Sequence, residues 1–309
     1  MYELHDVTRP GLMLSQVWPD SRERQGNTAN AMELAMRSGQ FAAFQTVEVP
    51  EAAERRVIRQ LIVDGDYHYT YCLTRILNEN GLNLSSLDRA VRARSSELVA
   101  ASLDQAREAG ADSVSVVSGP RPQHEIERRQ ALDALAESMR AVIRAALEPP
   151  AITVLLEPLD VTAHKRMTLG YTAEAVAICD RLAREGLPLR LSLDSAHILL
   201  NQELPADALR CSLSHIADFH YCNCVTDESD PLFGDRHLPF GPPGAVGITA
   251  IAEMMKAQSD MGYFGVEKRP VVMCEVLNQN DGDAEKLMQY CIDTMQAAWR
   301  QSVAATTAG

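Results

Sequence analysis

Short apolar runs alternate eight times along the chain with segments that show helical spacing of apolar residues. This alternation constrains the fold more than any other feature, because it is typical of strands joined by crossover helices in a parallel sheet. The expected strands are residues 11–17, 41–49, 67–73, 112–118, 152–157, 189–194, 216–223 and 271–276. The expected helices are residues 27–38, 51–63, 88–109, 126–147, 172–186, 248–261 and 283–299. Eight strands favour an α/β fold closed as a single (β/α)8 barrel, the TIM barrel.

The chain length is compatible with one such domain. A barrel of this kind needs about 250 residues, and the 309 residues contain no stretch that reads as a linker. An open, doubly wound sheet is the alternative, but no GxGxxG turn follows the first expected strand. We therefore expect one domain over residues 1–309, with residues 1–9 as an N-terminal extension and residues 302–309 as a frayed tail.

Charge and hydropathy disfavour two classes of partner. The 42 Asp and Glu residues outnumber the 29 Lys and Arg residues, for a net charge of −13. Such a surface disfavours nucleic acid, whose phosphates call for clustered cations. No apolar stretch reaches the ~18 residues of a membrane span, and the N-terminus has no apolar run suited to a signal peptide. Together with seven cysteines that mostly lie in apolar runs, this indicates a cytoplasmic protein.

Four consecutive strands carry a metal-binding side chain at or near the carboxyl end. These residues are Glu157, Asp194, His220 and Glu275. In a barrel, the carboxyl ends of the strands form the active-site mouth. A single strand-end carboxylate is usually just solvated, and a lone histidine is usually a core residue. Three carboxylates at one mouth, however, repel one another unless a cation neutralises them. We therefore predict one divalent metal ion bound by all four, and the ligands suit Mn²⁺, Mg²⁺, Co²⁺ or Zn²⁺.

Around these residues the sequence resembles the xylose-isomerase-like barrels, the sugar phosphate isomerase/epimerase superfamily that also contains endonuclease IV. The matching pieces occur in the same order as in the superfamily: 156–159 (LEPL), 193–197 (LDSAH), His220, 235–241 (DRHLPFG) and Glu275. The resemblance implies that Glu157, Asp194, His220 and Glu275 are the metal ligands, with Mn²⁺ as the first choice of ion.

The resemblance also implies substrate-binding roles for further residues. His197 matches a substrate-binding histidine, and Arg236 matches an arginine that contacts substrate oxygens. Asp235 and His237 match a pair that binds extra metal in the endonuclease branch, so they are candidates as metal ligands, as support for other ligands or as loop contacts. We count His237 among the substrate-binding residues. Asp160 stands where the superfamily often has Asn, and we interpret it as a possible base or as a further nearby acid in the substrate site.

These roles imply an isomerase or epimerase that acts on a sugar or a sugar-derived keto compound. Glu157 and Glu275 are the expected catalytic residues: one removes a carbon-bound proton and the other returns it, through a metal-bound enediolate. The alternative is a lyase (a dehydratase, a decarboxylase or a C-glycoside-cleaving enzyme) that acts on a 3-keto sugar, keto-inositol or keto-acid with the same metal site.

Two further alternatives differ in class. An endonuclease-like phosphodiesterase would need a basic groove, which the acidic composition disfavours. A non-catalytic metal or sugar binder would keep its activity in the cell after either glutamate is replaced. The expected partner is a small carbohydrate-like molecule. The resemblance is compatible with a homo-oligomer, for which the sequence has no signature of its own.

Overall fold

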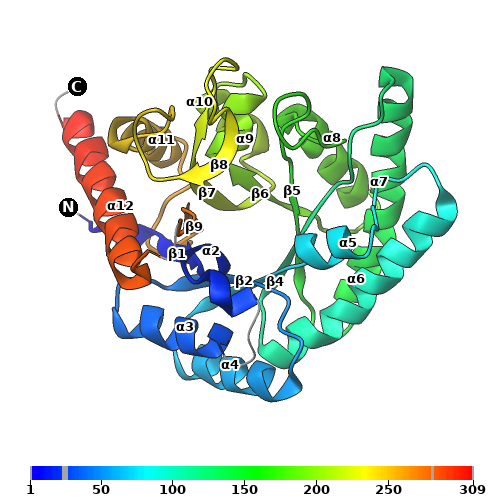
Figure 1. The fold of residues 1–309 in the computed structure, drawn as a ribbon, viewed down its shortest axis with the longest axis horizontal. Coiled ribbons are helices and arrows are strands. Elements are labelled where there is room, and N and C mark those ends of the chain that lie inside the picture. Colours follow the sequence, from blue (N-terminus) through cyan, green and yellow to red (C-terminus); the bar gives the residue numbers. More distant parts are fainter. Residues whose placement is uncertain (1, 23–26, 280–281, 308–309) are drawn as a thin grey trace.

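The computed structural model describes residues 2–22, 27–279 and 282–307. Eight parallel strands close into a barrel that the long helices surround (Figure 1). The barrel strands are β1 (Arg9–Met13), β2 (Ala43–Val47), β3 (His68–Cys72), β4 (Ser113–Val117), β5 (Thr153–Glu157), β6 (Arg190–Asp194), β7 (Ile216–Val225) and β9 (Val271–Glu275). Strands β1 to β7 pair in chain order, and β9 pairs with both β7 and β1. The predicted (β/α)8 barrel is confirmed.

All seven predicted long helices are present. They are α3 (Asn27–Arg37), α4 (Ala52–Asp64), α6 (Arg89–Ala109), α7 (Glu125–Ala146), α8 (Thr172–Ala183), α11 (Ile248–Asp260) and α12 (Ala284–Thr307). Helix α6 illustrates how the sequence sets their ends. The Asp88 carboxylate accepts a hydrogen bond from the backbone N–H of Ala90 at the start, and Gly110 adopts a φ of 78° at the end.

The structure also contains short helices that the sequence pattern did not predict, because segments this short show no clear helical period. They are α1 (Leu4–Val7), α2 (Leu14–Val17), η1 (Pro19–Arg22), α5 (Thr74–Glu79), α9 (Ser195–Leu200) and α10 (Pro205–Ser212). Helices α9 and α10 complete the connection between β6 and β7. Helix α5 lies at the carboxyl end of β3, beside the barrel mouth.

Both ends of the chain differ from the sequence expectation. Strand β1 begins at Arg9 and ends at Met13, so residues 14–17 form α2 and not the end of a strand. The expected extension is partly packed, since Leu4 and Val7 of α1 are buried. At the other end α12 continues to Thr307, so residues 302–307 are helical, and residues 308–309 lie outside the described residues. Ser302 helps to keep this end of the chain helical, because it is buried and its hydroxyl donates to the Trp299 carbonyl.

The loop expected over residues 225–247 contains a ninth strand. Strand β8 (Gly234–Leu238) runs antiparallel to the end of β7, with Cys224 opposite Asp235. Gly234 begins the strand with a φ of 103°, a conformation that glycine adopts at low cost. Figure 1 shows β8, in yellow, beside β7 of the barrel. This hairpin carries two of the candidate site residues, Asp235 and His237, back over the mouth.

All seven cysteines are free, and all but Cys211 are buried. This agrees with the position of most of them in apolar runs of the sequence. None of the helices in the described part of the chain combines the length and the apolar character needed to cross a membrane.

Candidate active site

A cavity of about 340 Å³ opens at the carboxyl ends of the barrel strands. Its walls come from the segments after β1 and β3, from the ends of β2, β4, β5 and β9, from the loop after β5, and from α9 and β8. Its charged and polar lining includes Gln16, Gln45, Arg75, Glu157, Lys165, His197, Asp235, His237 and Glu275. The cavity lies at the end of the barrel where catalytic residues are expected.

The structure brings the four predicted metal ligands together. Glu157 and Asp194 are the last residues of β5 and β6, and His220 lies opposite Asp194 in the pairing of β6 with β7. One potential ligand atom from each of these three residues lies within 4.8 Å of the other two. Glu275 completes the group, with Oε2 3.0 Å from Nδ1 of His220. This proximity follows from the register, because neighbouring parallel strands end at the same height.

The buried charges of this group favour a bound cation. Burial raises the pKa of Glu157 to about 7 and that of Asp194 to about 6. Burial also acts to raise the pKa of Glu275, but His237 and His220 outweigh it and hold this pKa well below the ordinary value. Ionised carboxylates in such a place cost free energy unless a cation accompanies them. Three carboxylates and one imidazole are a donor set that suits Mn²⁺ or Zn²⁺, so these residues fit a divalent metal.

His197 lies beside this group and lines the cavity. Its Nδ1 is 3.4 Å from Oδ2 of Asp160, and its Nε2 is 3.7 Å from Oδ2 of Asp235. Burial alone would lower the pKa of His197, but the contact with Asp160 and the charges of Asp194 and Asp235 raise it to about 9. His197 is therefore a buried imidazolium at neutral pH in the metal-free protein.

Asp160, a predicted substrate-binding residue, is fully buried and is not among the described residues that line the cavity. Its carboxylate accepts hydrogen bonds from the backbone N–H groups of His164 and Lys165, at 2.5 and 2.8 Å. Asp160 thus anchors the loop that follows β5 through these hydrogen bonds. Its carboxylate also contacts Nδ1 of His197. These contacts indicate that Asp160 positions the side chain of His197. A direct contact between Asp160 and the substrate stays a prediction.

The β7–β8 hairpin adds a second group to the site. Potential ligand atoms of Cys222, Asp235 and His237 also lie within 4.8 Å of one another. His237 Nε2 is 2.9 Å from Oε1 of Glu275, which joins the two groups. Lys165 places its Nζ 3.0 Å from Oδ2 of Asp235. Because this ammonium already neutralises Asp235, the second group has less need of a metal ion than the first.

Arg236 is a predicted site residue that does not join this arrangement. It is exposed and does not appear among the described residues lining the cavity. The reason is the two-residue repeat of a strand, which turns Asp235 and His237 to one face of β8 and Arg236 to the other. A substrate contact by Arg236 stays a prediction.

Sequence reasoning missed Gln16 and Lys165. Nε2 of Gln16 is 3.5 Å from Oε1 of Glu275. It was overlooked because the first strand was expected to run to residue 17, which placed Gln16 inside a strand and not just beyond its carboxyl end. Lys165 belongs to the loop after β5, and a lysine in a loop has no signal that separates it from an ordinary surface residue.

Most of the sequence matches one known protein family. The profile of the family described as xylose isomerase-like TIM barrel matches residues 28–296. The chain belongs to this family. The family assignment confirms the resemblance inferred from the strand-end motifs.

Solved structures with the same fold include several sugar epimerases. D-psicose 3-epimerase from Clostridium cellulolyticum H10 is 16% identical over 96% of this chain and 98% of its own, with a TM-score of 0.69. The 3-keto-D-glucoside 4-epimerase from E. coli is 12% identical over 93% and 98%, with a TM-score of 0.66. The IOLI protein, described with a bound zinc atom, is 13% identical over 94% and 98%, with a TM-score of 0.67. No curated protein matches the sequence significantly.

Proposed function

We propose that the chain is a divalent-metal-dependent isomerase or epimerase that acts on a sugar or a sugar-derived keto compound. The observation that carries this proposal is the meeting of Glu157, Asp194, His220 and Glu275 beside a cavity of about 340 Å³. The structural relatives support the substrate class, since two of them are named as epimerases of D-psicose and of a 3-keto-D-glucoside.

The proposed cofactor is one divalent ion held by these four residues, with Mn²⁺ as the first choice. When bound, the ion polarises the carbonyl and neighbouring hydroxyl of the substrate, which makes the adjacent C–H more acidic. The two glutamates come from β5 and β9, which β6 and β7 separate around the barrel. One glutamate removes the carbon-bound proton, and the other delivers a proton to the same carbon from the opposite face or to its neighbour. The first outcome is an epimer and the second is an aldose–ketose isomer.

The remaining polar residues of the cavity hold and shield the substrate. His197, Lys165 and His237 offer N–H donors to hydroxyl and carbonyl oxygens, and all three line the cavity. Strand β8 covers one side of the mouth, so it reduces the access of water to the reacting carbon. The lyase alternative has no contact among the described residues that favours it over proton transfer alone.

The test is an isotope-exchange assay in D₂O. Mn²⁺-loaded protein would be incubated with ketohexoses and with 3-keto glucosides, and products would be followed by NMR and mass spectrometry. We expect deuterium at the carbon next to the carbonyl, together with an epimer or isomer. Loss of water, CO₂ or an aglycone would contradict the proposal in favour of the lyase, and no exchange with any of these sugars would also contradict it.

Variants of the two glutamates give the first mutational prediction. Glu157→Gln and Glu275→Gln keep the side-chain shape but remove the proton acceptor, so each lowers kcat by about 10²–10⁴-fold. Glu253→Gln is the matched control, because Glu253 is exposed on α11. Circular dichroism checks that each variant is folded. Wild-type kcat in either site variant would contradict the assigned roles.

A further inference from the structure

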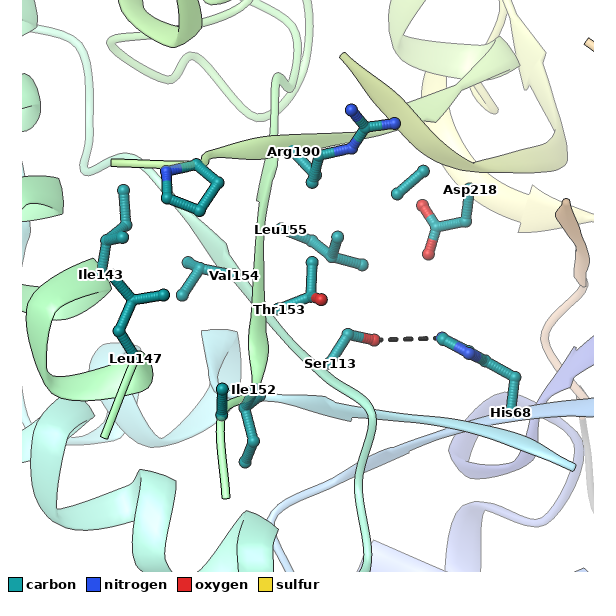
Figure 2. A pocket seen from close by; sticks show the side chains of 13 residues that line it. His68, Ser113, Ile143, Leu147, Ile152, Thr153, Val154, Leu155, Arg190 and Asp218 are labelled. Carbon is teal, nitrogen blue, oxygen red and sulfur yellow. Dashed lines mark hydrogen bonds between the residues drawn. The ribbon is translucent and has the colours of Figure 1, made fainter. Parts of the chain in front are cut away.

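The two ring nitrogens of His220 face opposite ends of the barrel. Nδ1 is 3.0 Å from Oε2 of Glu275, which lines the catalytic cavity. Nε2 is 3.3 Å from Oγ of Ser192 and 3.8 Å from Oδ2 of Asp218. Asp218 belongs to the lining of a second cavity, of about 380 Å³, at the amino-terminal end of the strands (Figure 2). His220 therefore presents Nδ1 to the group of carboxylates and turns Nε2 toward the interior of the barrel.

The pairing of β6 with β7 explains why Ser192 reaches this nitrogen. Asp194 lies opposite His220, and two residues earlier on each strand Ser192 lies opposite Asp218. Side chains two residues apart on a strand point to the same side, so Ser192 shares the face of Asp194 but lies one layer deeper in the barrel. Both Ser192 and His220 are buried, which shields the contact between them from water.

Ser192 is the hydrogen-bond partner of Nε2. Its hydroxyl lies within hydrogen-bond distance, whereas 3.8 Å to Asp218 is too long for a hydrogen bond. Neither carboxylate oxygen of Asp218 has a hydrogen-bond partner among the described residues. A serine hydroxyl has two lone pairs, so Oγ of Ser192 can accept a hydrogen bond from a ring N–H.

We propose that Ser192 is a positioning residue for the metal ligand His220. This inference rests on the proposed metal site, in which Nδ1 is the ligand atom of His220. A histidine bound to a metal through one ring nitrogen keeps its proton on the other, and a hydrogen bond from that proton fixes the orientation of the ring. The hydroxyl of Ser192 accepts this hydrogen bond and so holds Nδ1 toward Glu157, Asp194 and Glu275.

A second contact between a serine and a histidine provides a matched control. At the amino-terminal cavity, Oγ of Ser113 on β4 is 3.2 Å from Nε2 of His68 (Figure 2). Ser113 is as buried as Ser192, since each is 1% exposed. Neither Ser113 nor His68 is among the described residues that line the catalytic cavity. Replacement of Ser113 by alanine therefore removes the same kind of contact at a distance from the proposed metal ligands.

Calorimetric titration of the metal-free, full-length protein with Mn²⁺ tests the proposal. We expect Ser192→Ala to bind Mn²⁺ about 10- to 100-fold more weakly than the wild type, because the ring of His220 loses its support. Ser113→Ala should keep the wild-type affinity. Wild-type affinity in Ser192→Ala, or an equal loss in Ser113→Ala, would overturn this proposal alone. No binding of Mn²⁺ by the wild type would overturn the proposed metal site together with it, so the two failures are distinguishable.

Nuclear magnetic resonance of Zn²⁺-loaded protein with ¹⁵N-labelled histidine supplies a readout of the ring itself. We expect His220 to carry its proton on Nε2, and the signals that disappear in His220→Gln identify this ring. Ser192→Ala should shift the Nε2–H signal and speed its exchange with water, which a serine that only fills space would not do. An unshifted signal in Ser192→Ala, or a proton on Nδ1 in the wild type, would overturn the proposal. The wild-type spectrum keeps the test valid if Ser192→Ala does not fold.

Discussion

At the residue scale, His197 connects the two halves of the candidate active site. It lies between Asp160, which holds the loop after β5, and Asp235 of β8. Its backbone N–H also donates to Asp194, so the same residue touches a predicted metal ligand. Because folding raises the pKa of His197, the protonated imidazole stabilises the folded, metal-free protein.

The pH dependence of stability follows from this raised pKa. An imidazole whose pKa rises from 6.5 to about 9 on folding stabilises the protein fully below pH 6.5, and this contribution is lost as the pH rises through 9. For metal-free protein we expect a loss on the order of 3 kcal/mol from His197 across this window. Urea unfolding at several pH values measures it.

His197→Asn provides the comparison, and the exposed His5→Asn is its control. The His197 variant should lose less stability than the wild type as the pH rises from 6.5 to 9. Other histidines of the site titrate in both proteins, so the difference between the two curves isolates His197. Parallel curves for wild type and His197→Asn would show that this imidazole does not carry the effect.

At the scale of elements, the β7–β8 hairpin completes the mouth of the barrel. Asn223 on β7 fastens the chain beyond it, because its side-chain amide donates to the carbonyls of Pro239 and Gly241. Its side-chain oxygen accepts from the backbone N–H of Val246. The hairpin is therefore an ordered part of the site and not a free loop.

Gly234→Ala tests the importance of the hairpin. Gly234 has a φ of 103°, and an added Cβ would lie 2.5 Å from the ring of His164. We expect a loss of about 1–3 kcal/mol in the free energy of unfolding and a displaced β8. Weaker metal binding should follow, since His237 of β8 contacts Glu275.

Gly262→Ala is the matched control for this prediction. Gly262 also has a positive φ, of 70°, but no atom lies within 4 Å of the added Cβ. This control should lose stability from backbone strain alone and keep wild-type metal affinity. Equal metal affinity in the Gly234 and Gly262 variants, measured by calorimetry, would argue against a role of the hairpin in the site.

At the scale of the whole molecule, we expect the acidic mouth to make stability dependent on the proposed metal ion. Buried carboxylates at the ends of β5, β6 and β9 repel one another in the metal-free barrel, and a divalent ion that binds only the folded protein stabilises it. The effect reaches the whole barrel because the ligands come from strands that are far apart in the sequence.

Addition of Mn²⁺ should therefore raise the melting temperature of chelator-treated protein. At 100 times the dissociation constant, the gain in unfolding free energy is about 2.7 kcal/mol. Asp194→Asn should abolish most of this gain, while Asp227→Asn, an exposed change in the loop after β7, should retain it. Differential scanning calorimetry measures both. An equal rise in Asp194→Asn and wild type would show that the ion binds elsewhere.

The sequence by itself determined the barrel and the meeting of four potential metal ligands at its mouth. The alternation of strand and helix periods reflects local burial, which each segment carries in its own pattern. Glu157, Asp194 and Glu275 end their strands, so their meeting follows once the strands are parallel and closed. The family motifs around them added the expected chemistry.

Only the tertiary structure decided the rest of the site. Strand β1 ends at Met13 because its pairing with β2 and β9 ends there, and this frees Gln16 to reach Glu275. The pairing of β8 with β7 turns His237 inward and Arg236 outward, and it brings Asp235 to Lys165. These features depend on contacts between segments distant in the sequence, which no local pattern encodes.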